Sequence, residues 1–244
     1  MHPKPTDMTP AIERYIQNLS QVDGWGINDD VAPIFVALNE AQDSLSVRGN
    51  LFEIGVHEGR TAILLALMAK AEESCVFLDL FDQQEQNLDQ SGRGNLEVFL
   101  KNLHRWAPGT VSEIIAGNSM KQDFRQVEKL KAGVRFAHID GGHYREVALN
   151  DLYKTEAVLC PGGLIIVDDF LHSGFLGVNE ACNYYLREAQ GERLSPVASG
   201  ENKLVLASRS HADGYRAKLG ATLKYPRGKT LEFYGEQILC LDGH

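Results

Sequence analysis

Apolar side chains recur at helical spacing over the first 48 positions of the chain. Two apolar faces result, formed by Ile12, Tyr15, Ile16 and Leu19 and by Val31, Ile34, Phe35 and Leu38. Gly24-Trp25-Gly26 separates the two stretches, because glycine interrupts a helix. We interpret Trp25, like Trp106 further along, as a packing residue at a helix end. The pattern predicts two amphipathic helices that cover a neighbouring unit rather than an independent domain.

Short apolar runs alternate with helical periods from residue 50 onward. The runs typical of strands are 51–56, 75–81, 111–116, 134–140 and 163–169. The helical periods between them are 61–71, 95–106, 122–133 and 145–159. Strands rich in Val, Ile and Leu on both faces are typical of a parallel sheet that helices cover. The fold class is therefore α/β: a doubly wound, mostly parallel sheet with an N-terminal helical appendage.

The pattern weakens after residue 170. Pro161-Gly162-Gly163 is expected to end the helix before the last of these strands, because proline cannot continue a helix. Beyond it we expect a helix that contains Tyr184, Tyr185 and Leu186, a strand over 203–208 and a last apolar run at 237–241. The expected organisation is an N-terminal helical cap over 1–48 and one α/β domain over 49–244.

Composition and charge narrow the classes of partner. The chain has 244 residues, 43% of them hydrophobic and 23% charged, which is typical of a globular protein. Lys and Arg total 24 against 33 Asp and Glu, for a net charge of −9. A negative protein repels phosphate backbones and anionic lipid. We therefore expect no nucleic-acid or membrane partner.

The cysteines and the beginning of the chain bear on the compartment. Cysteines at positions 75, 160, 182 and 240 show no CxxC spacing, which argues against a disulfide framework. The first ten residues lack the pattern of a secretory signal. The longest apolar run, Ala62 to Ala69, is far shorter than the roughly 18 residues of a membrane span. These features predict a cytoplasmic protein.

A glycine-bearing turn follows the first predicted strand, where parallel α/β sheets bind ligands. It contains Glu53, Gly55 and Gly59, and Thr61 begins the next predicted helix. It is neither a GxGxxG turn nor a phosphate loop that ends in GK[ST]. A glutamate at the strand end suits a cationic amine better than a pyrophosphate. The alternative is a tight turn in which the glycines serve only the backbone geometry.

The next two strand ends supply further polar groups. Asp79, or else Asp82, could accept hydrogen bonds from ribose hydroxyls, and Asn118 and Ser119 suit an adenine edge. A glycine turn followed by these two strand ends describes a nucleoside with a cationic tail. S-adenosylmethionine is such a molecule.

On these residues the chain resembles the class I S-adenosylmethionine-dependent methyltransferases over about 50–170. The segment HIDGGHYREVALNDLYKTEAVLCPGGLIIVDDF is similar to the macrocin-type sugar O-methyltransferases and their small-molecule relatives. The resemblance implies that Glu53, Gly55 and Gly59 hold the methionine end and Asp79 the ribose. It also implies that Asn118 and Ser119 hold the adenine, and we expect Thr61 at the cofactor as well.

Three carboxylates close the last two strands of the predicted parallel sheet. Asp140 ends one strand, and Asp168 and Asp169 end the next. Carboxylates that converge repel one another unless they are protonated or bind a cation. All-oxygen ligation favours a hard ion such as Mg²⁺, with Ca²⁺ or Mn²⁺ as the alternatives. The alternative is that the pair caps a helix and Asp140 is a turn residue. The resemblance favours the metal, because catechol-type and macrocin-type enzymes hold Mg²⁺ at these strand ends.

The resemblance also implies a base. His143 lies where catechol-type enzymes carry a lysine base, and imidazole titrates near neutral pH. The alternative role of His143 is to cap the following helix, and His172 is a second candidate for the base.

We therefore expect a metal-assisted O-methyltransferase in which Asp140 and His143 are catalytic. Its expected acceptor is a hydroxyl of a small molecule such as a sugar moiety or a natural-product intermediate. The alternatives are a non-catalytic partner protein that binds S-adenosylmethionine and a hydroxylase-like relative on the same fold. The apolar loop that contains Phe170, Leu171, Phe175 and Leu176 could be a substrate lid or a contact in a homo-oligomer.

Overall fold

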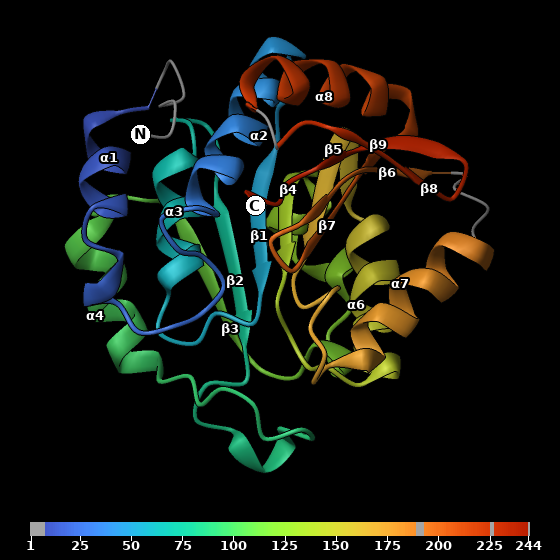
Figure 1. Cartoon of the computed structure of the whole chain (residues 1–244). Coiled ribbons are helices and arrows are strands. Elements are labelled where there is room, and N and C mark those ends of the chain that lie inside the picture. The colour runs from blue at the N-terminus through green and yellow to red at the C-terminus, as the bar shows by residue number, and fades with distance from the viewer. Residues whose placement is uncertain (1–7, 189–192, 225–226, 244) are drawn as a thin grey trace.

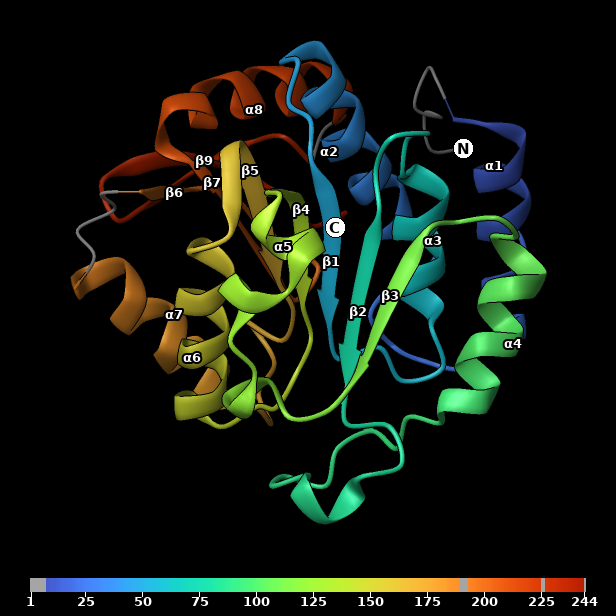
Figure 2. The same cartoon turned by 180° about the vertical axis from the view of Figure 1, so that it is seen from behind.

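The computed structural model describes residues 8–188, 193–224 and 227–243, which form one mixed sheet with helices on both faces (Figures 1 and 2). Nine strands lie in the order β3-β2-β1-β4-β5-β7-β6-β9-β8. The strands are β1 (Asn50–Ile54), β2 (Cys75–Asp79), β3 (Ser112–Ala116), β4 (Val134–Ile139), β5 (Leu159–Val167), β6 (Leu194–Gly200), β7 (Lys203–Ser208), β8 (Thr230–Phe233) and β9 (Glu236–Cys240). Strands β1 to β5 are parallel, and β7 runs antiparallel to β5 and β6. The predicted doubly wound, mostly parallel sheet is confirmed.

The helices divide between the two faces of the sheet. They are α1 (Pro10–Ile16), α2 (Ala32–Ser44), α3 (Arg60–Met68), α4 (Leu96–Trp106), α5 (Glu128–Lys131), α6 (Arg145–Glu156), α7 (Leu176–Glu188) and α8 (Arg209–Thr222). Short 3-10 turns are η1 (Leu19–Gln21), η2 (Gln84–Gln86), η3 (Ser119–Lys121) and η4 (Phe124–Gln126). Helices α1 to α4 and α8 pack on one face, and α5 to α7 on the other. Successive side chains of β1 point to opposite faces of the sheet. Leu51 packs in the core on the face of α1 to α4 and α8, and Phe52 packs in the core on the face of α5 to α7.

The two N-terminal helices are confirmed and share a core with the sheet. Helix α1 packs on α3, and α2 packs on α8 and α3. A buried guanidinium strengthens this contact: Arg135 of β4 donates to Gln42 at 2.5 Å and to Asn39 at 2.8 Å, both on α2. The same group lies 2.7 Å from the carboxylate of Glu73. Segment 17–31, which includes the predicted break, then leads from α1 to α2.

The Pro161-Gly162-Gly163 turn is a wrong prediction. Helix α6 ends at Glu156, and these three residues lie inside β5. Gly162 has a φ of +83°, and the register of β5 against β4 shifts beside this segment. A bulged strand accommodates a glycine in this conformation, so proline and glycine mark an irregular strand here rather than a turn.

Other expected elements differ in extent or were missed. Residues 122–133 do not form one helix, because Val127 adopts an extended backbone between η4 and α5. After residue 170, α7, β7 and β9 confirm the expected helix, strand and apolar run. The structure adds β6, α8 and β8, which the sequence pattern did not indicate. No helix in the described ranges is long and apolar enough to cross a membrane.

Candidate active site

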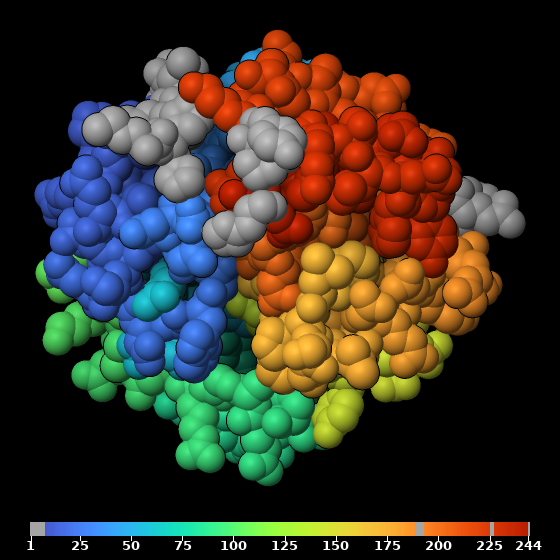
Figure 3. All heavy atoms as spheres, in the orientation of Figure 1, coloured from blue at the N-terminus to red at the C-terminus, as the bar shows by residue number. Residues whose placement is uncertain are grey.

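A cavity of about 750 Å³ lies at the carboxyl ends of the parallel strands. Its walls come from segment 25–31, the turns after β1 to β5, loop 80–95 and the β6–β7 turn. Figure 3 shows the hollow where the N-terminal segment in blue meets the loop in green and the segment after β5 in gold. Most of the predicted site residues line it: Gly55, Asp79, Asn118, Ser119, Asp140, His143, Asp168 and Asp169. A cavity at this edge is the usual ligand site of such sheets.

The β1–α3 turn requires its glycines. Gly55 has a φ of +83°, and a Cβ there would collide with the backbone carbonyl of Asp140. Gly59, with a φ of +96°, precedes the first residue of α3, and a Cβ on it would lie 2.6 Å from the ring of Phe99. Gly55 borders the cavity, whereas Gly59 and Thr61 are not among its lining residues. The β1–α3 turn therefore packs so closely against the turn after β4 that only glycine fits at position 55.

Asp79 lies on the side of the cavity that is predicted for the ribose. Its Oδ2 accepts hydrogen bonds from the backbone N–H groups of Val56, at 2.6 Å, and His57, at 2.8 Å. Its Oδ1 accepts a third bond from the N–H of Phe81 at 2.5 Å. Asp82, the alternative candidate, is exposed and does not line the cavity. Asp79 is thus the better placed of the two.

The loop after β3 forms the side predicted for adenine. Asn118 Oδ1 accepts a hydrogen bond from the N–H of Met120 at 2.9 Å. This bond caps the start of the η3 turn. Lys154 of α6 fixes this turn by donating to the carbonyls of Ser119, Met120 and Gln122 at 2.8 to 3.0 Å. The loop therefore presents Asn118 and Ser119 to the cavity from a rigid support.

Glu53 does not face the cavity but a histidine on the next strand. Its Oε1 lies 2.8 Å from Nδ1 of His138, and both side chains are almost fully buried. The register pairs Glu53 with His138 across β1 and β4. Burial raises the pKa of Glu53 to about 7, although the contact with His138 opposes this shift. His138 lies inside strand β4, and its contacts connect Glu53 with the site.

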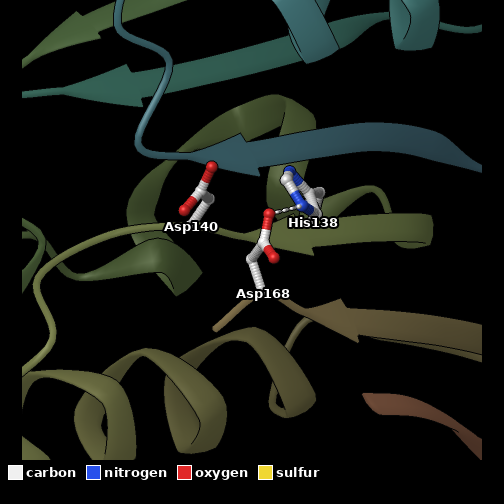
Figure 4. A group of neighbouring side chains, drawn as sticks. All are labelled: His138, Asp140 and Asp168. Carbon is white, nitrogen blue, oxygen red and sulfur yellow. Dashed lines mark ion pairs between the residues drawn. The ribbon is translucent and has the colours of Figure 1, made fainter. Parts of the chain in front are cut away.

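His138 also contacts the acidic cluster, as Figure 4 shows. Its Nε2 lies 3.5 Å from Oδ2 of Asp168, and Lys203 Nζ lies 2.6 Å from Oδ1 of the same carboxylate. Burial alone would lower the pKa of His138, but the contacts with Asp168 and Glu53 raise it to about 9. Burial likewise opposes ionisation of Asp168, yet Lys203 and His138 hold its pKa below the ordinary value. This carboxylate is therefore ionised and already partnered.

Asp140 has a different environment from Asp168. Its carboxylate accepts no hydrogen bond from any of the residues that the structure describes. Burial and the neighbouring charge of Asp168 raise the pKa of Asp140. A cation would relieve this repulsion.

His143 lies between two carboxylates. Its Nδ1 is 2.9 Å from Oδ2 of Asp89, and its Nε2 is 2.9 Å from Oδ2 of Asp169. Its ring stacks on Phe175 at 3.7 Å between centroids. Burial alone would lower the pKa of His143, but Asp169 and Asp89 raise it to about 9. In this arrangement His143 carries a proton at neutral pH.

Two groups of three side chains could hold a metal ion. His138, Asp140 and Asp168 form one group, and Asp140, His143 and Asp169 form the other, each with ligand atoms within 4.8 Å of one another. Among the described residues, neither group contains all three predicted aspartates. Carboxylate oxygens suit a hard divalent cation, and Asp140 is common to both groups. The donor set therefore fits such an ion around Asp140.

Sequence reasoning missed three contributors and misjudged a fourth. Asp89 and Ser91 lie in loop 80–95, and Lys203 begins the strand that was expected over 203–208. A lysine at the start of a buried apolar run was a signal for a buried partner. Trp25 is not a packing residue: it is 74% exposed, lines the cavity and lies 5.1 Å from the His57 ring. Trp106 is buried, as expected.

Comparison with known proteins relates part of the chain to a family. Residues 52–170 match a family described as "Methyltransferase domain". No curated protein matches the chain. Similar solved structures include the O-methyltransferase NovP, with 15% identity, coverage of 75% of this chain and 81% of that one, and a TM-score of 0.63.

Two further structures show the same fold. An O-methyltransferase from Bacillus cereus in complex with S-adenosylhomocysteine has 16% identity, covers 84% and 91% of the two chains and has a TM-score of 0.54. CalS11, a TDP-rhamnose 3′-O-methyltransferase, has 17% identity, coverage of 85% and 96%, and a TM-score of 0.52. The family match and the fold agree with the cavity at the strand ends. Residues 52–170 therefore match a methyltransferase domain, and the chain shares the fold of the class I S-adenosylmethionine-dependent methyltransferases.

Proposed function

We propose that this methyltransferase transfers a methyl group to a hydroxyl oxygen of a small molecule with the help of a divalent cation, Mg²⁺ by preference. The observation that carries the proposal is the half-buried carboxylate of Asp140, which has no hydrogen-bond partner among the described residues and lies beside Asp168. Asp140, Asp168 and Asp169 would hold the ion. When bound, it would supply positive charge that lowers the pKa of the acceptor hydroxyl.

The chain's own residues would bind and orient the two reactants. The turn at Gly55 holds the methionine end of the cofactor. Glu53, Gly59 and Thr61 support this turn from behind the cavity wall. Asp79 holds the ribose, and Asn118 and Ser119 hold the adenine. A fixed cofactor and a fixed acceptor turn methyl transfer into an effectively unimolecular step, provided that the oxygen lies in line with the sulfonium methyl.

His143 is the proposed base, with His172 as the second candidate. Nε2 of His143 faces Asp169, so it can take the acceptor proton only after its own proton leaves and this contact opens. His172 lies in the cavity wall and stacks on Phe175 at 4.4 Å between centroids. A His143→Gln variant that keeps full turnover would assign the base to His172.

The names of similar proteins support the acceptor class. NovP is called an O-methyltransferase, and CalS11 is called a TDP-rhamnose 3′-O-methyltransferase. We propose a sugar moiety or a natural-product intermediate as the acceptor, in the cytoplasm, with no nucleic-acid or membrane partner. Leu171 and Leu176 are 53% and 69% exposed, which leaves both roles of their segment open, a substrate lid or a contact in a homo-oligomer.

Calorimetry on metal-stripped protein tests the proposal. We expect S-adenosylmethionine binding in the wild type, a Mg²⁺ signal that Asp140→Asn abolishes, and a loss of turnover by about 100-fold or more in that variant. Asp82→Asn, which makes the same change on an exposed residue, is the control. Unchanged Mg²⁺ binding and turnover in Asp140→Asn would contradict the metal site. Cofactor binding without S-adenosylhomocysteine formation with any hydroxyl acceptor would favour a non-catalytic partner protein.

A second candidate, a hydroxylase-like activity, has one observation in its favour. Iron hydroxylases commonly use one or two histidines with carboxylates, and His143 groups with Asp140 and Asp169. Both ring nitrogens of His143 already face carboxylates, which disfavours it as a ligand. Oxygen consumption with Fe²⁺ and an acceptor, without S-adenosylhomocysteine formation, would support this candidate.

A further inference from the structure

Lys203, the first residue of β7, carries a buried ammonium at the acidic cluster. Its Nζ lies 2.6 Å from Oδ1 of Asp168, and only 5% of the lysine side chain is exposed. The register of β7 on β5 pairs Leu204 with Val167, which fixes the lysine beside Asp168. A buried ammonium is costly without a partner, so this contact is part of the charge balance of the site.

The chain supplies its own cations to two of the three proposed ligands. Asp168 has Lys203, and Asp169 has His143 at 2.9 Å and an amide bond from Asn202 at 2.7 Å. Only Asp140 is left without a donor among the described residues. A divalent ion that uses Asp168 therefore meets a carboxylate whose Oδ1 already accepts from an ammonium.

We propose that Lys203 is the resident counter-ion of Asp168 and competes with the divalent cation for that carboxylate. The lysine thereby sets the affinity of the site for the ion. This inference rests on the proposed function, since it takes Asp140, Asp168 and Asp169 as the ligand set. Two positive charges on one carboxylate repel each other strongly in a buried site. Ion binding at Asp168 must therefore weaken or displace the lysine contact.

A Mg²⁺ titration of the Lys203→Gln variant tests the competition. Glutamine keeps a hydrogen-bond donor for Asp168 but removes the charge, so the site stays satisfied. We expect Mg²⁺ to bind about tenfold more tightly or better than to the wild type, because close charge pairs couple at this level. Lys121→Gln is the matched control, because it removes the same charge from a lysine that donates to Gln86 instead of to Asp168. We expect this variant to bind Mg²⁺ with the affinity of the wild type.

Amine labelling of the wild type gives a second measurement that needs no variant. Reductive methylation read by mass spectrometry should modify Lys203 slowly in metal-stripped protein, because the ammonium is buried and paired. Added Mg²⁺ should raise the labelling of Lys203 several-fold and leave that of Lys121 unchanged. Labelling of Lys203 that does not respond to saturating Mg²⁺ would contradict displacement.

The outcomes separate this inference from the proposed function. Equal or weaker Mg²⁺ binding in Lys203→Gln, with binding intact in the wild type, overturns the role of Lys203 alone. Absence of Mg²⁺ binding in both proteins overturns the competition and the metal part of the proposed function together. S-adenosylmethionine binding in the same samples reports that each protein is folded.

Discussion

At the scale of single residues, Gly55 is the position most tightly fixed by the backbone. Its positive φ is strained for any other residue, and a Cβ would strike the carbonyl of Asp140. We expect Gly55→Ala to lower the free energy of unfolding by roughly 3 kcal/mol or more. S-adenosylmethionine binding should fall in the same variant, because the ends of β1 and β4 must separate to make room for the alanine side chain.

Gly235→Ala separates strain from collision. Gly235 has a similar φ of +74°, but nothing lies within 4 Å of the position of its Cβ. We expect this control to cost about 1 kcal/mol and to bind the cofactor as the wild type does. Thermal unfolding and calorimetry measure both quantities. Equal losses of stability in the two variants would show that the contact with Asp140 relaxes.

Residue types at strand ends could be predicted from sequence, but their partners could not. Asp140, Asp168 and Asp169 follow buried strands, and parallel strands bring their carboxyl ends to one edge. Glu53 was expected at the cofactor for the same reason. Its partner, His138, comes from a strand 85 positions along the chain, and only the register of β1 on β4 brings them together. Such pairing leaves no local signal.

At the scale of elements, loop 80–95 is fastened to the site through one carboxylate. Asp89 Oδ2 accepts from the backbone N–H of His143 at 2.6 Å and lies 2.9 Å from Nδ1 of the same residue. We expect Asp89→Asn to speed proteolysis within 83–95 several-fold and to raise KM. Asp82→Asn removes a charge from the same loop without this contact and serves as the control. If loop 80–95 of Asp89→Asn is cleaved at the same rate as in the wild type, the contact between Asp89 and His143 does not hold the loop in place.

The same contact predicts a pH dependence with a defined sign. The contacts lower the pKa of Asp89 and raise that of His143 to about 9. The His143 contribution is complete below its ordinary pKa of 6.5 and is lost as pH rises through about 9. Asp89 contributes above its ordinary value, 3.8, and its contribution is lost as pH falls. Hydrogen exchange of the loop, corrected for intrinsic rates, should accelerate above about pH 9 and less so in Asp89→Asn.

The elements before residue 170 were easier to predict than those after it. The hydrophobic pattern of a strand or a helix depends only on neighbouring residues, so β1 to β5 could be predicted from the sequence. Strand β6 contains Pro196 and Gly200, and α8 contains Gly214 and Gly220, which lower the propensity for each element. Tertiary contacts override these preferences: α8 buries Ala212, Tyr215 and Leu219 against the sheet.

At the scale of the whole molecule, residues 1–48 are expected to be a cap that cannot be removed. Deleting them takes away Asn39 and Gln42, two acceptors of the buried Arg135 guanidinium, and uncovers apolar side chains of α3 and α8. Removing partners from a buried charge costs about 3–5 kcal/mol, a large share of the stability of a typical domain. The fragment 49–244 should therefore lack a cooperative thermal transition, bind a hydrophobic dye and lose S-adenosylmethionine binding. The fragment 8–244, which keeps every described contact, is the control. Cooperative unfolding of 49–244 together with cofactor binding would show instead that the α/β unit folds alone and that the N-terminal helices only complete the wall of the cavity.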